Sequence, residues 1–388
     1  MKIGHVIPSL VSGGAEAMVF GLAREFALAG HSVEVIRLDK ATGSSYEDRM
    51  IELLQEVGIA TCSLDRKPGS SVFGVTAAAK LWWLAQRKQF DVIHSHLGLS
   101  DAFAGLVKRF SPAPFDHVLT VHNTEDARSG VANLLCGRPT VVYCSRTSAR
   151  AVKMRHHRRV TIPNGIPLAK YRYSESSRIA LRAALGLSES AFVVISVGNL
   201  REQKNYDCAI SGIAGGRNIL AEANVHYLIC GDGPESQRLK TKVRELGLVD
   251  RIHFLGVRTD VPDLLSAADL FLSTSLYEGM PLAVLESLAA SLPCLLSPLE
   301  EHREITEGIP CVELLTTNSP EAVARGLHTA TSNRPKRNEL VTIRGSALEP
   351  FEIAHCASAY LALYEELRMA RSGLSKCLTA ANSSGQLR

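Results

Sequence analysis

The run Ile162-Pro163-Asn164-Gly165-Ile166-Pro167 separates two stretches of the sequence that share one pattern. Its prolines flank an Asn-Gly pair, a combination that neither a helix interior nor a strand tolerates. The chain has 388 residues, which is enough for two domains of ordinary size. We therefore expect a first domain over residues 1–165, a second domain over residues 166–349, and a closing helix with a flexible tail over residues 350–388.

Short β-branched runs alternate with amphipathic segments on both sides of this boundary. Strands are expected in the first half at 3–7, 32–38, 91–94, 117–121 and 141–144, and in the second half at 192–197, 225–230, 251–254, 270–273 and 294–296. Strands separated by helices predict an α/β fold with two doubly wound, Rossmann-like parallel sheets. Ligands of such sheets bind beyond the carboxyl ends of the strands, so two facing domains predict a binding cleft between them.

The composition excludes several classes of protein. Apolar residues make up 46% of the chain, which suits a globular fold. The net charge of +4 is too small to indicate nucleic-acid binding, although residues 1–165 carry 20 basic and 14 acidic side chains. No apolar stretch is long enough for a transmembrane helix, and the opening residues read as a strand rather than a signal peptide. With nine cysteines and no Cys-x-x-Cys pair, these features predict a cytoplasmic protein.

Two glycines follow the first expected strand, in Ser12-Gly13-Gly14-Ala15-Glu16. They allow the backbone to approach a ligand closely, and the helix that begins here offers free N–H groups to an anion such as phosphate. The alternative is a tight turn in which Glu16 caps the helix.

A second candidate site follows the first strand of the second domain. Arg201 and Lys204, in the run 198–205, could hold a diphosphate, although solvated loop charges are the competing interpretation. Gly231-Asp232-Gly233-Pro234 lacks the third glycine of a dinucleotide-binding fingerprint, and we interpret it as a turn beside the site.

The most informative segment runs from Ser273 to Glu286. Glu278 follows a strand, Pro281 suits the first position of a helix, and Glu286 comes about one turn later. A carboxylate beside a diphosphate would be repelled, so we expect both glutamates to accept hydrogen bonds from sugar hydroxyls. The alternative is that Glu278 stabilises a helix dipole and Glu286 is a surface residue.

His122 ends an expected strand and could point into the cleft and act in the chemical step as a catalytic residue, although a histidine buried in the core is a serious alternative. His94 and His96 carry the same ambiguity. No His-x-x-x-His or Asp-x-Asp pair exists, so the spacing supports no divalent-metal site. No Gly-x-x-x-x-Gly-Lys-Ser/Thr run exists either, which excludes P-loop enzymes.

Taken together and in order, these segments resemble the GT-B glycosyltransferases, and specifically glycosyltransferase family 4. The likeness covers nearly the whole chain, from the Gly13-Gly14 turn through the boundary run to Glu278 and Glu286, which match the family's Glu-x7-Glu motif. It implies a retaining transfer of a sugar from a nucleoside diphosphate sugar to an acceptor hydroxyl, without metal or other cofactor.

The resemblance also implies residue roles. Glu278 and the backbone that follows it would hold the donor hexose, Glu286 the ribose and Lys204 the diphosphate, while Lys204 and the Gly13-Gly14 amides would stabilise the leaving group. The backbone concerned belongs to Gly279, Met280, Pro281 and Leu282. Asn199 departs from the family, which commonly has arginine there, so either Arg201 supplies the second positive charge or donor affinity is reduced. The loop before Glu304, which matches a family glutamate, lacks the usual paired glycines.

Other functions remain open on the sequence. A sugar-nucleotide epimerase of the same fold would bind a similar donor, since fold does not determine chemistry. A non-catalytic sugar-nucleotide-binding partner is a further alternative, and an NAD-dependent oxidoreductase is weaker because no complete Gly-x-Gly-x-x-Gly follows either first strand.

The basic first half suggests a peripheral membrane surface, where a lipid-linked saccharide in polysaccharide synthesis would be the acceptor. Lys80, Trp83 and Arg87 share one face of the helix expected at 77–89, while Leu81, Trp82 and Ala85 lie on a face suited to the core. The basic run from Arg150 to Arg159 could add attraction to anionic lipid. A solvated basic face is the alternative.

Overall fold

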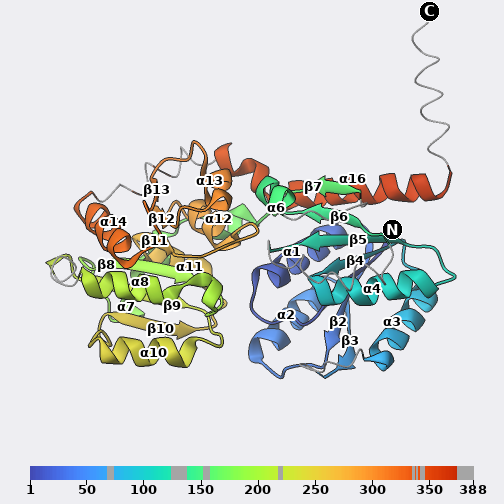
Figure 1. Cartoon of the computed structure of the whole chain (residues 1–388), viewed down its shortest axis with the longest axis horizontal. Coiled ribbons are helices and arrows are strands. Elements are labelled where there is room, and N and C mark those ends of the chain that lie inside the picture. The colour runs from blue at the N-terminus through green and yellow to red at the C-terminus, as the bar shows by residue number, and fades with distance from the viewer. Residues whose placement is uncertain are drawn as a thin grey trace, which may run out of the picture.

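The computed structural model describes residues 1–67, 74–123, 138–151, 158–216, 222–333, 337, 340 and 346–373. Two α/β domains lie side by side, and the long last helix runs across the first of them (Figure 1). Each domain is built on one sheet in which every strand pairing is parallel.

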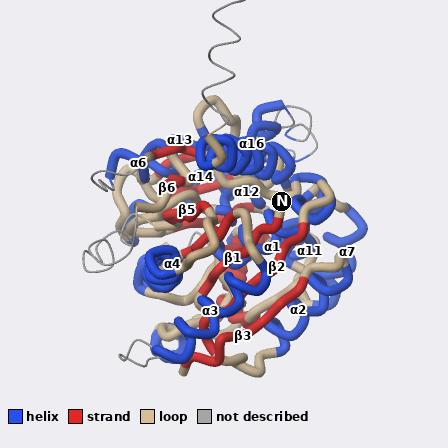
Figure 2. The backbone as a smooth tube through the Cα atoms, turned by 90° about the vertical axis from the view of Figure 1, so that its right-hand side faces the viewer, coloured by secondary structure: helices blue, strands red, loops and turns tan. Residues whose placement is uncertain are grey.

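The first sheet has seven strands in the order β3-β2-β1-β4-β5-β6-β7. The strands are β1 (Lys2–Ile7), β2 (Ser32–Asp39), β3 (Ala60–Arg66), β4 (Val92–His96), β5 (Asp116–Val121), β6 (Thr140–Tyr143) and β7 (Arg159–Thr161). The helices are α1 (Gly14–Leu28), α2 (Ser45–Glu56), α3 (Val75–Lys88), α4 (Gly98–Phe110) and α6 (Arg146–Ala151). The strand order reverses between β1 and β4, so the loops after these strands diverge and leave room for a ligand. Figure 2 shows α1 and α2 on one side of the sheet and α3 and α4 on the other.

The second sheet has six strands in the order β10-β9-β8-β11-β12-β13. The strands are β8 (Phe192–Val197), β9 (Val225–Cys230), β10 (Ile252–Gly256), β11 (Leu270–Ser273), β12 (Cys294–Leu296) and β13 (Val312–Leu314). Its α-helices are α7 (Glu175–Ala184), α8 (Tyr206–Gly215), α10 (Ser236–Glu245), α11 (Val261–Ala267), α12 (Leu282–Ala289), α13 (Glu300–Thr306) and α14 (Pro320–Ser332). The 3-10 helices of the described second half are η2 (Leu168–Tyr171), η3 (Glu202–Lys204) and η4 (Glu349–Phe351). The order reverses between β8 and β11, the strands that precede Lys204 and Glu278.

All the strands expected from the sequence are present, and three strands were not expected. The unexpected strands are β3, β7 and β13, each of which forms an edge of its sheet. Edge strands keep part of their side-chain surface in water, so they lack the apolar runs that mark the interior strands.

The closing helix returns to the first domain. It runs from Ile353 to Arg371 as α16, three residues later than its expected start, because Pro350 lies in the preceding turn η4. The Tyr360 hydroxyl meets that of Thr120 on β5 at 2.7 Å, and the Tyr364 hydroxyl meets His94 Nδ1 on β4 at 2.6 Å. The tail after residue 373 lies outside the described residues.

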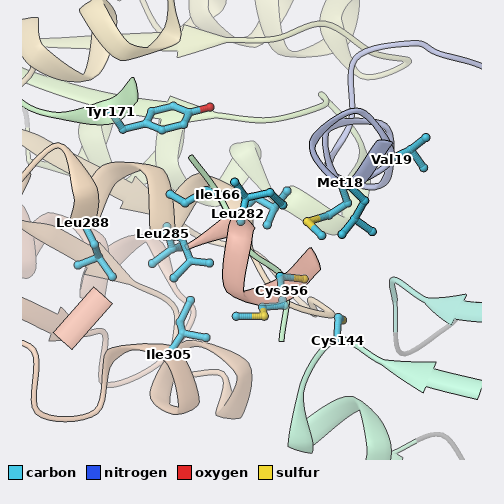
Figure 3. Close-up of a cluster of buried hydrophobic side chains, with 14 of the residues drawn as sticks. Met18, Val19, Cys144, Ile166, Tyr171, Leu282, Leu285, Leu288, Ile305 and Cys356 are labelled. Carbon is cyan, nitrogen blue, oxygen red and sulfur yellow. The ribbon is translucent and has the colours of Figure 1, made fainter. Parts of the chain in front are cut away.

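The chain therefore crosses between the domains twice, and the two crossings lie side by side. Ile166 N donates to Phe351 O at 2.9 Å, and Ile353 N donates to Ile166 O at 3.0 Å. Beside them, one buried apolar cluster joins α1, α12, α13 and α16, as Figure 3 shows with Met18, Leu285, Ile305 and Cys356. The two domains thus share a continuous core at their junction.

Gly165 lies where this junction is tightest. A Cβ atom on Gly165 would lie 2.7 Å from Ile353 Cα and 3.0 Å from Cys356 Cβ, both on the first turn of α16. The boundary run is therefore a packed joint and not a free linker.

We predict that Gly165→Ala destabilises the protein by about 1–3 kcal/mol, because the added methyl group forces backbone apart. The midpoint of urea unfolding measures this change. Gly215→Ala is the matched control, since Gly215 is exposed on α8 and a Cβ there meets no atom within 4 Å. An unfolding midpoint that is the same in both variants would show that the joint can relax.

Candidate active site

The candidate residues gather where the carboxyl ends of the two sheets face each other. A Cβ on Gly279, after β11, would lie 1.9 Å from the carbonyl oxygen of His122, after β5. A Cβ on Gly13, after β1, would lie 3.5 Å from Asn199 Nδ2, after β8, and one on Gly14 would lie 3.9 Å from Leu282 Cδ1. Loops from both domains therefore meet at one place, as the sequence predicted for its strand-end motifs.

Glu278 is a buried carboxylate with a positively charged partner. Its Oε1 accepts a hydrogen bond from Lys204 Nζ at 2.6 Å and another from Ser275 Oγ at 2.7 Å. Burial opposes ionisation of Glu278, but the Lys204 ammonium and the Ser275 hydroxyl outweigh it and lower the pKa of Glu278. Glu278 is therefore ionised at neutral pH.

The ion pair leaves binding capacity on both partners. Among the described residues, no donor reaches Oε2 of Glu278, and Lys204 Nζ uses one of its three N–H groups. Oε2 can accept a hydrogen bond from a ligand hydroxyl while Lys204 donates to a ligand phosphate. One ion pair can thus bind both parts of a sugar diphosphate.

Helix α12 begins beside this pair without a side-chain cap. Pro281 is its N-cap, one position earlier than the sequence suggested, so the first N–H groups from Leu282 onward are free of side-chain partners. One turn later, Glu286 Oε1 accepts a hydrogen bond from the hydroxyl of Tyr171 at 2.7 Å. Burial raises the pKa of Glu286, and the Tyr171 hydroxyl and the Lys170 charge oppose that rise. Glu286 is half-buried and paired, so the interpretation of Glu286 as a plain surface residue is wrong.

Helix α1 also begins without a side-chain cap, at the Gly13-Gly14 turn. Glu16 is buried in its first turn, and burial raises the pKa of Glu16 to about 7, although its own backbone N–H and the charge of Arg201 lower it. The positive charge of Arg201 therefore reaches the carboxyl group of Glu16. A protonated Glu16 would not repel a phosphate bound at α1.

His122 lies at the domain junction, as its strand-end position suggested, and its Nε2 is 3.0 Å from Nδ1 of the buried His96. Burial lowers the pKa of His122 to about 4, so its ring is neutral at pH 7. Its carbonyl oxygen packs against Gly279, and Gln203 Nε2 donates to the neighbouring Asn123 Oδ1 at 3.3 Å. The loop after β5 is thereby held against both loops of the second domain.

Two predicted loop features have structural roles. Cβ atoms on Gly231 and Gly233 would lie 2.1 Å from Gly198 O and 2.6 Å from Leu200 O, so this turn supports the loop that carries Lys204. The Glu304 carboxylate accepts hydrogen bonds from the backbone N–H groups of Arg146 and Thr147, at 2.8 and 2.9 Å. Glu304 therefore caps α6 of the opposite domain, a role that sequence analysis did not foresee.

Several polar groups at the junction were not predicted from the sequence. The hydroxyl of Ser145 donates to Gly279 O at 2.9 Å, and that of Ser275 fixes Glu278. Another such group is the hydroxyl of Tyr46 on α2. Burial raises the pKa of Tyr46 to about 12, and the charges of Glu16 and Glu286 add to the rise. Serine and tyrosine are too common in sequences to signal a site by themselves.

We predict that Lys204→Met destabilises the protein by about 3 kcal/mol at pH 7, because it leaves Glu278 buried without a positively charged partner. Lys204 keeps some exposure, so the lower end of the usual range applies. The effect depends on pH. In the wild type, the lowered pKa of Glu278 gives stability that is lost only as pH falls through that pKa. In the variant, burial alone would raise this pKa above its unfolded value.

The stability deficit of Lys204→Met should therefore be smaller at pH 5 than at pH 7, as urea unfolding at both pH values measures. The double variant Lys204→Met with Glu278→Gln is the control and should recover most of the lost stability. A deficit that does not change with pH would contradict the ion-pair interpretation.

Two family profiles match the chain in succession. "Glycosyltransferase Family 4" matches residues 12–170, and "Glycosyl transferases group 1" matches residues 177–343. Together they cover the whole second sheet and every strand of the first sheet except β1, and they meet near the boundary run.

Individual proteins are similar at low identity. The chain is 25% identical over 387 residues to N-acetyl-alpha-D-glucosaminyl L-malate synthase of Bacillus anthracis, covering 95% of this chain and 97% of that protein. It is 27% identical over 235 residues to UDP-Gal:alpha-D-GlcNAc-diphosphoundecaprenol alpha-1,3-galactosyltransferase of Escherichia coli, covering 56% and 60%. The crystal structure of HepE from Anabaena in complex with UDP and glucose superposes with a TM-score of 0.79 at 21% identity, covering 94% of this chain and all of that one. The two-sheet architecture is that of the GT-B fold.

Proposed function

The chain belongs to glycosyltransferase family 4, and on that premise we propose that it transfers a sugar, with retention at the anomeric carbon, from a nucleoside diphosphate sugar to a lipid-linked saccharide in surface-polysaccharide synthesis. The observation that carries the donor half of this proposal is the Lys204–Glu278 pair at the start of α12. The Lys204 ammonium can bind a phosphate, and the free carboxylate oxygen of Glu278 can accept a hydrogen bond from a sugar hydroxyl. The two groups are themselves joined by one hydrogen bond.

In the proposed complex, the uncapped N-termini of α1 and α12 and the Lys204 ammonium face the diphosphate. Glu278 Oε2 accepts from a hexose hydroxyl, and Glu286 accepts from the ribose with the carboxylate oxygen that Tyr171 leaves free. Arg201, whose charge reaches Glu16, adds positive potential where Asn199 has none. These groups hold the donor across the domain junction.

In the reaction, the bond between the anomeric carbon and the phosphate oxygen breaks, and the acceptor oxygen bonds to the same face of that carbon. The acceptor proton passes to the departing phosphate oxygen, so no protein base is needed. Negative charge grows on that phosphate, where Lys204 and the Gly13-Gly14 amides stabilise it more strongly than in the ground state. Because the protein itself supplies the positive charge that stabilises the leaving phosphate, we expect activity to persist in EDTA.

We predict that Glu286→Ala lowers nucleotide affinity about 10- to 100-fold, the loss expected for hydrogen bonds to a charged group. Calorimetry with UDP, GDP and ADP would measure it and also identify the base. Glu245→Ala, an exposed carboxylate on α10, should bind as the wild type does. If Glu286→Ala binds the preferred nucleotide as tightly as Glu245→Ala, Glu286 is not in the donor site.

The acceptor half of the proposal rests on the outer surface of α3 and α4. Trp83 is 53% exposed and Phe110 is 65% exposed. Arg87 lies 5.0 Å over the Trp83 ring, so these residues share a face as expected. Trp82 was expected in the core, but it is 38% exposed because its indole N–H donates to Phe110 O at the end of α4. Exposed aromatic rings among basic side chains suit the interface of an anionic membrane.

In the second basic run, Arg150 to Arg159, residues 152–157 lie outside the described residues. Within the described part of the chain, no helix is both long and apolar enough to cross a membrane. The association that we propose is a peripheral one, through the exposed aromatic and basic side chains of α3 and α4.

We predict that the protein sediments with anionic phosphatidylglycerol vesicles at low salt, and that Trp83→Ser with Phe110→Ser abolishes most of this binding. Val249→Ser is the matched control, since Val249 is 55% exposed in the second domain. Two results would contradict a membrane-binding role for this surface: vesicle binding that survives the double substitution, or protein that stays in the supernatant with all vesicles. Either result would favour a water-soluble acceptor.

A further inference from the structure

Four histidines of the first domain form a connected group behind the candidate active site. His5 lies on β1, His94 and His96 lie on β4, and His122 follows β5. Burial lowers the pKa of His5 to about 3 and those of His94 and His96 well below the ordinary value. Every ring is thus neutral at pH 7 and carries one proton, on either Nδ1 or Nε2.

His94 is a side branch of this group. Its Nε2 lies 2.7 Å from Thr120 Oγ1, and its Nδ1 lies 2.6 Å from the hydroxyl of Tyr364. Ring nitrogens of His5, His94 and His96 lie within 4.8 Å of one another, close enough to ligate one ion. An ion there would have to displace hydrogen bonds that already occupy both nitrogens of His94, so the protein's own hydrogen bonds compete with it.

The other three rings form a chain that ends at the active site. His5 Nδ1 lies 3.0 Å from His96 Nε2, and His96 Nδ1 lies 3.0 Å from His122 Nε2. Each hydrogen bond holds one proton, so the chain has two arrangements. Either every ring carries its proton on Nδ1, or every ring carries it on Nε2.

His5, at the buried end of this row of three rings, distinguishes the two proton arrangements. His5 Nε2 is buried without a hydrogen-bond partner among the described residues, and the ring stacks on Phe26 with centroids 5.6 Å apart. A buried N–H without an acceptor is rarer in proteins than a buried acceptor without a donor. The arrangement that leaves His5 Nε2 bare is therefore favoured, and it places a proton on Nδ1 of each ring.

We infer that His5 and His96 are positioning residues, which hold His122 in the tautomer with its proton on Nδ1. This inference rests on the proposed function and places His122 at the donor sugar, because the loop that carries His122 packs against Gly279, next to Glu278. His122 then serves as a hydrogen-bond donor through Nδ1, for which the described residues provide no acceptor. It does not serve as a base, in agreement with a mechanism in which the phosphate oxygen takes the acceptor proton.

Nuclear magnetic resonance of the full-length protein with ring-¹⁵N histidine tests the tautomer directly. Couplings from the ring C–H protons distinguish a protonated nitrogen from a bare one, and His122→Asn identifies the His122 signals by their loss. We expect a protonated Nδ1 and a bare Nε2 on His122, without any donor bound. A protonated Nε2 would overturn the inference.

Kinetics test whether the hydrogen-bonded row of His5, His96 and His122 matters for the reaction. His96→Phe fills the same space without nitrogen, so His122 should lose its single tautomer and kcat should fall about tenfold or more, with nucleotide affinity unchanged. Should that variant fail to fold, His96→Gln replaces it, because glutamine can face His5 but cannot donate from the Nδ1 position. His226→Phe is the matched control, since His226 and His253 form an equivalent 3.0 Å pair in the second domain.

Two outcomes separate this inference from the proposed function. A His122 tautomer that stays fixed in His96→Phe overturns the positioning role, whatever the activity. A lost tautomer with unchanged kcat overturns it as well, and also removes His122 from the donor site. Support requires both changes in His96→Phe and neither in His226→Phe.

Discussion

The close approach of Gly279 to His122 is the constraint on which the active site depends. No side chain fits at residue 279, because its Cβ would overlap the carbonyl oxygen of the opposite domain. Contact at backbone distance brings the loops after β5 and β11 together, and Ser145 fixes the Gly279 carbonyl from the first domain. Glu278 precedes this contact and α12 follows it, so one glycine sets the position of both the carboxylate and the helix N-terminus relative to the first domain.

Three glutamates near this contact differ in protonation because their surroundings differ. Glu278 has Lys204 and Ser275 as partners, and its pKa is lowered in spite of burial. Glu286 has only a neutral tyrosine as a direct partner, and Glu16 has a more distant arginine, so burial prevails and both pKa values rise. The result is one carboxylate that its partners keep ionised beside two carboxyl groups whose negative charge burial disfavours.

The sequence predicted the two sheets and most of the candidate site, because these depend on local patterns. Apolar runs marked the interior strands, and glycine, lysine or glutamate in the segments after strands marked the loops. The contacts between distant residues were not predictable in the same way. His5 and His96 are 91 residues apart and meet only because β1 and β4 are neighbours in the sheet. Trp82 was misplaced for a similar reason, since helical periodicity does not show that the end of α4 offers a carbonyl to its indole.

The return of α16 to the first domain has a consequence for biosynthesis. A ribosome makes the whole second sheet before it makes the helix that completes the first one. Until residues 353–371 emerge, the hydroxyl of Thr120 and the ring of His94 lack their partners Tyr360 and Tyr364, and the part of α1 that packs against α16 is exposed. The domain that is begun first is therefore finished last, and the nascent chain carries an exposed apolar surface through most of its synthesis, which is the situation in which chaperones bind.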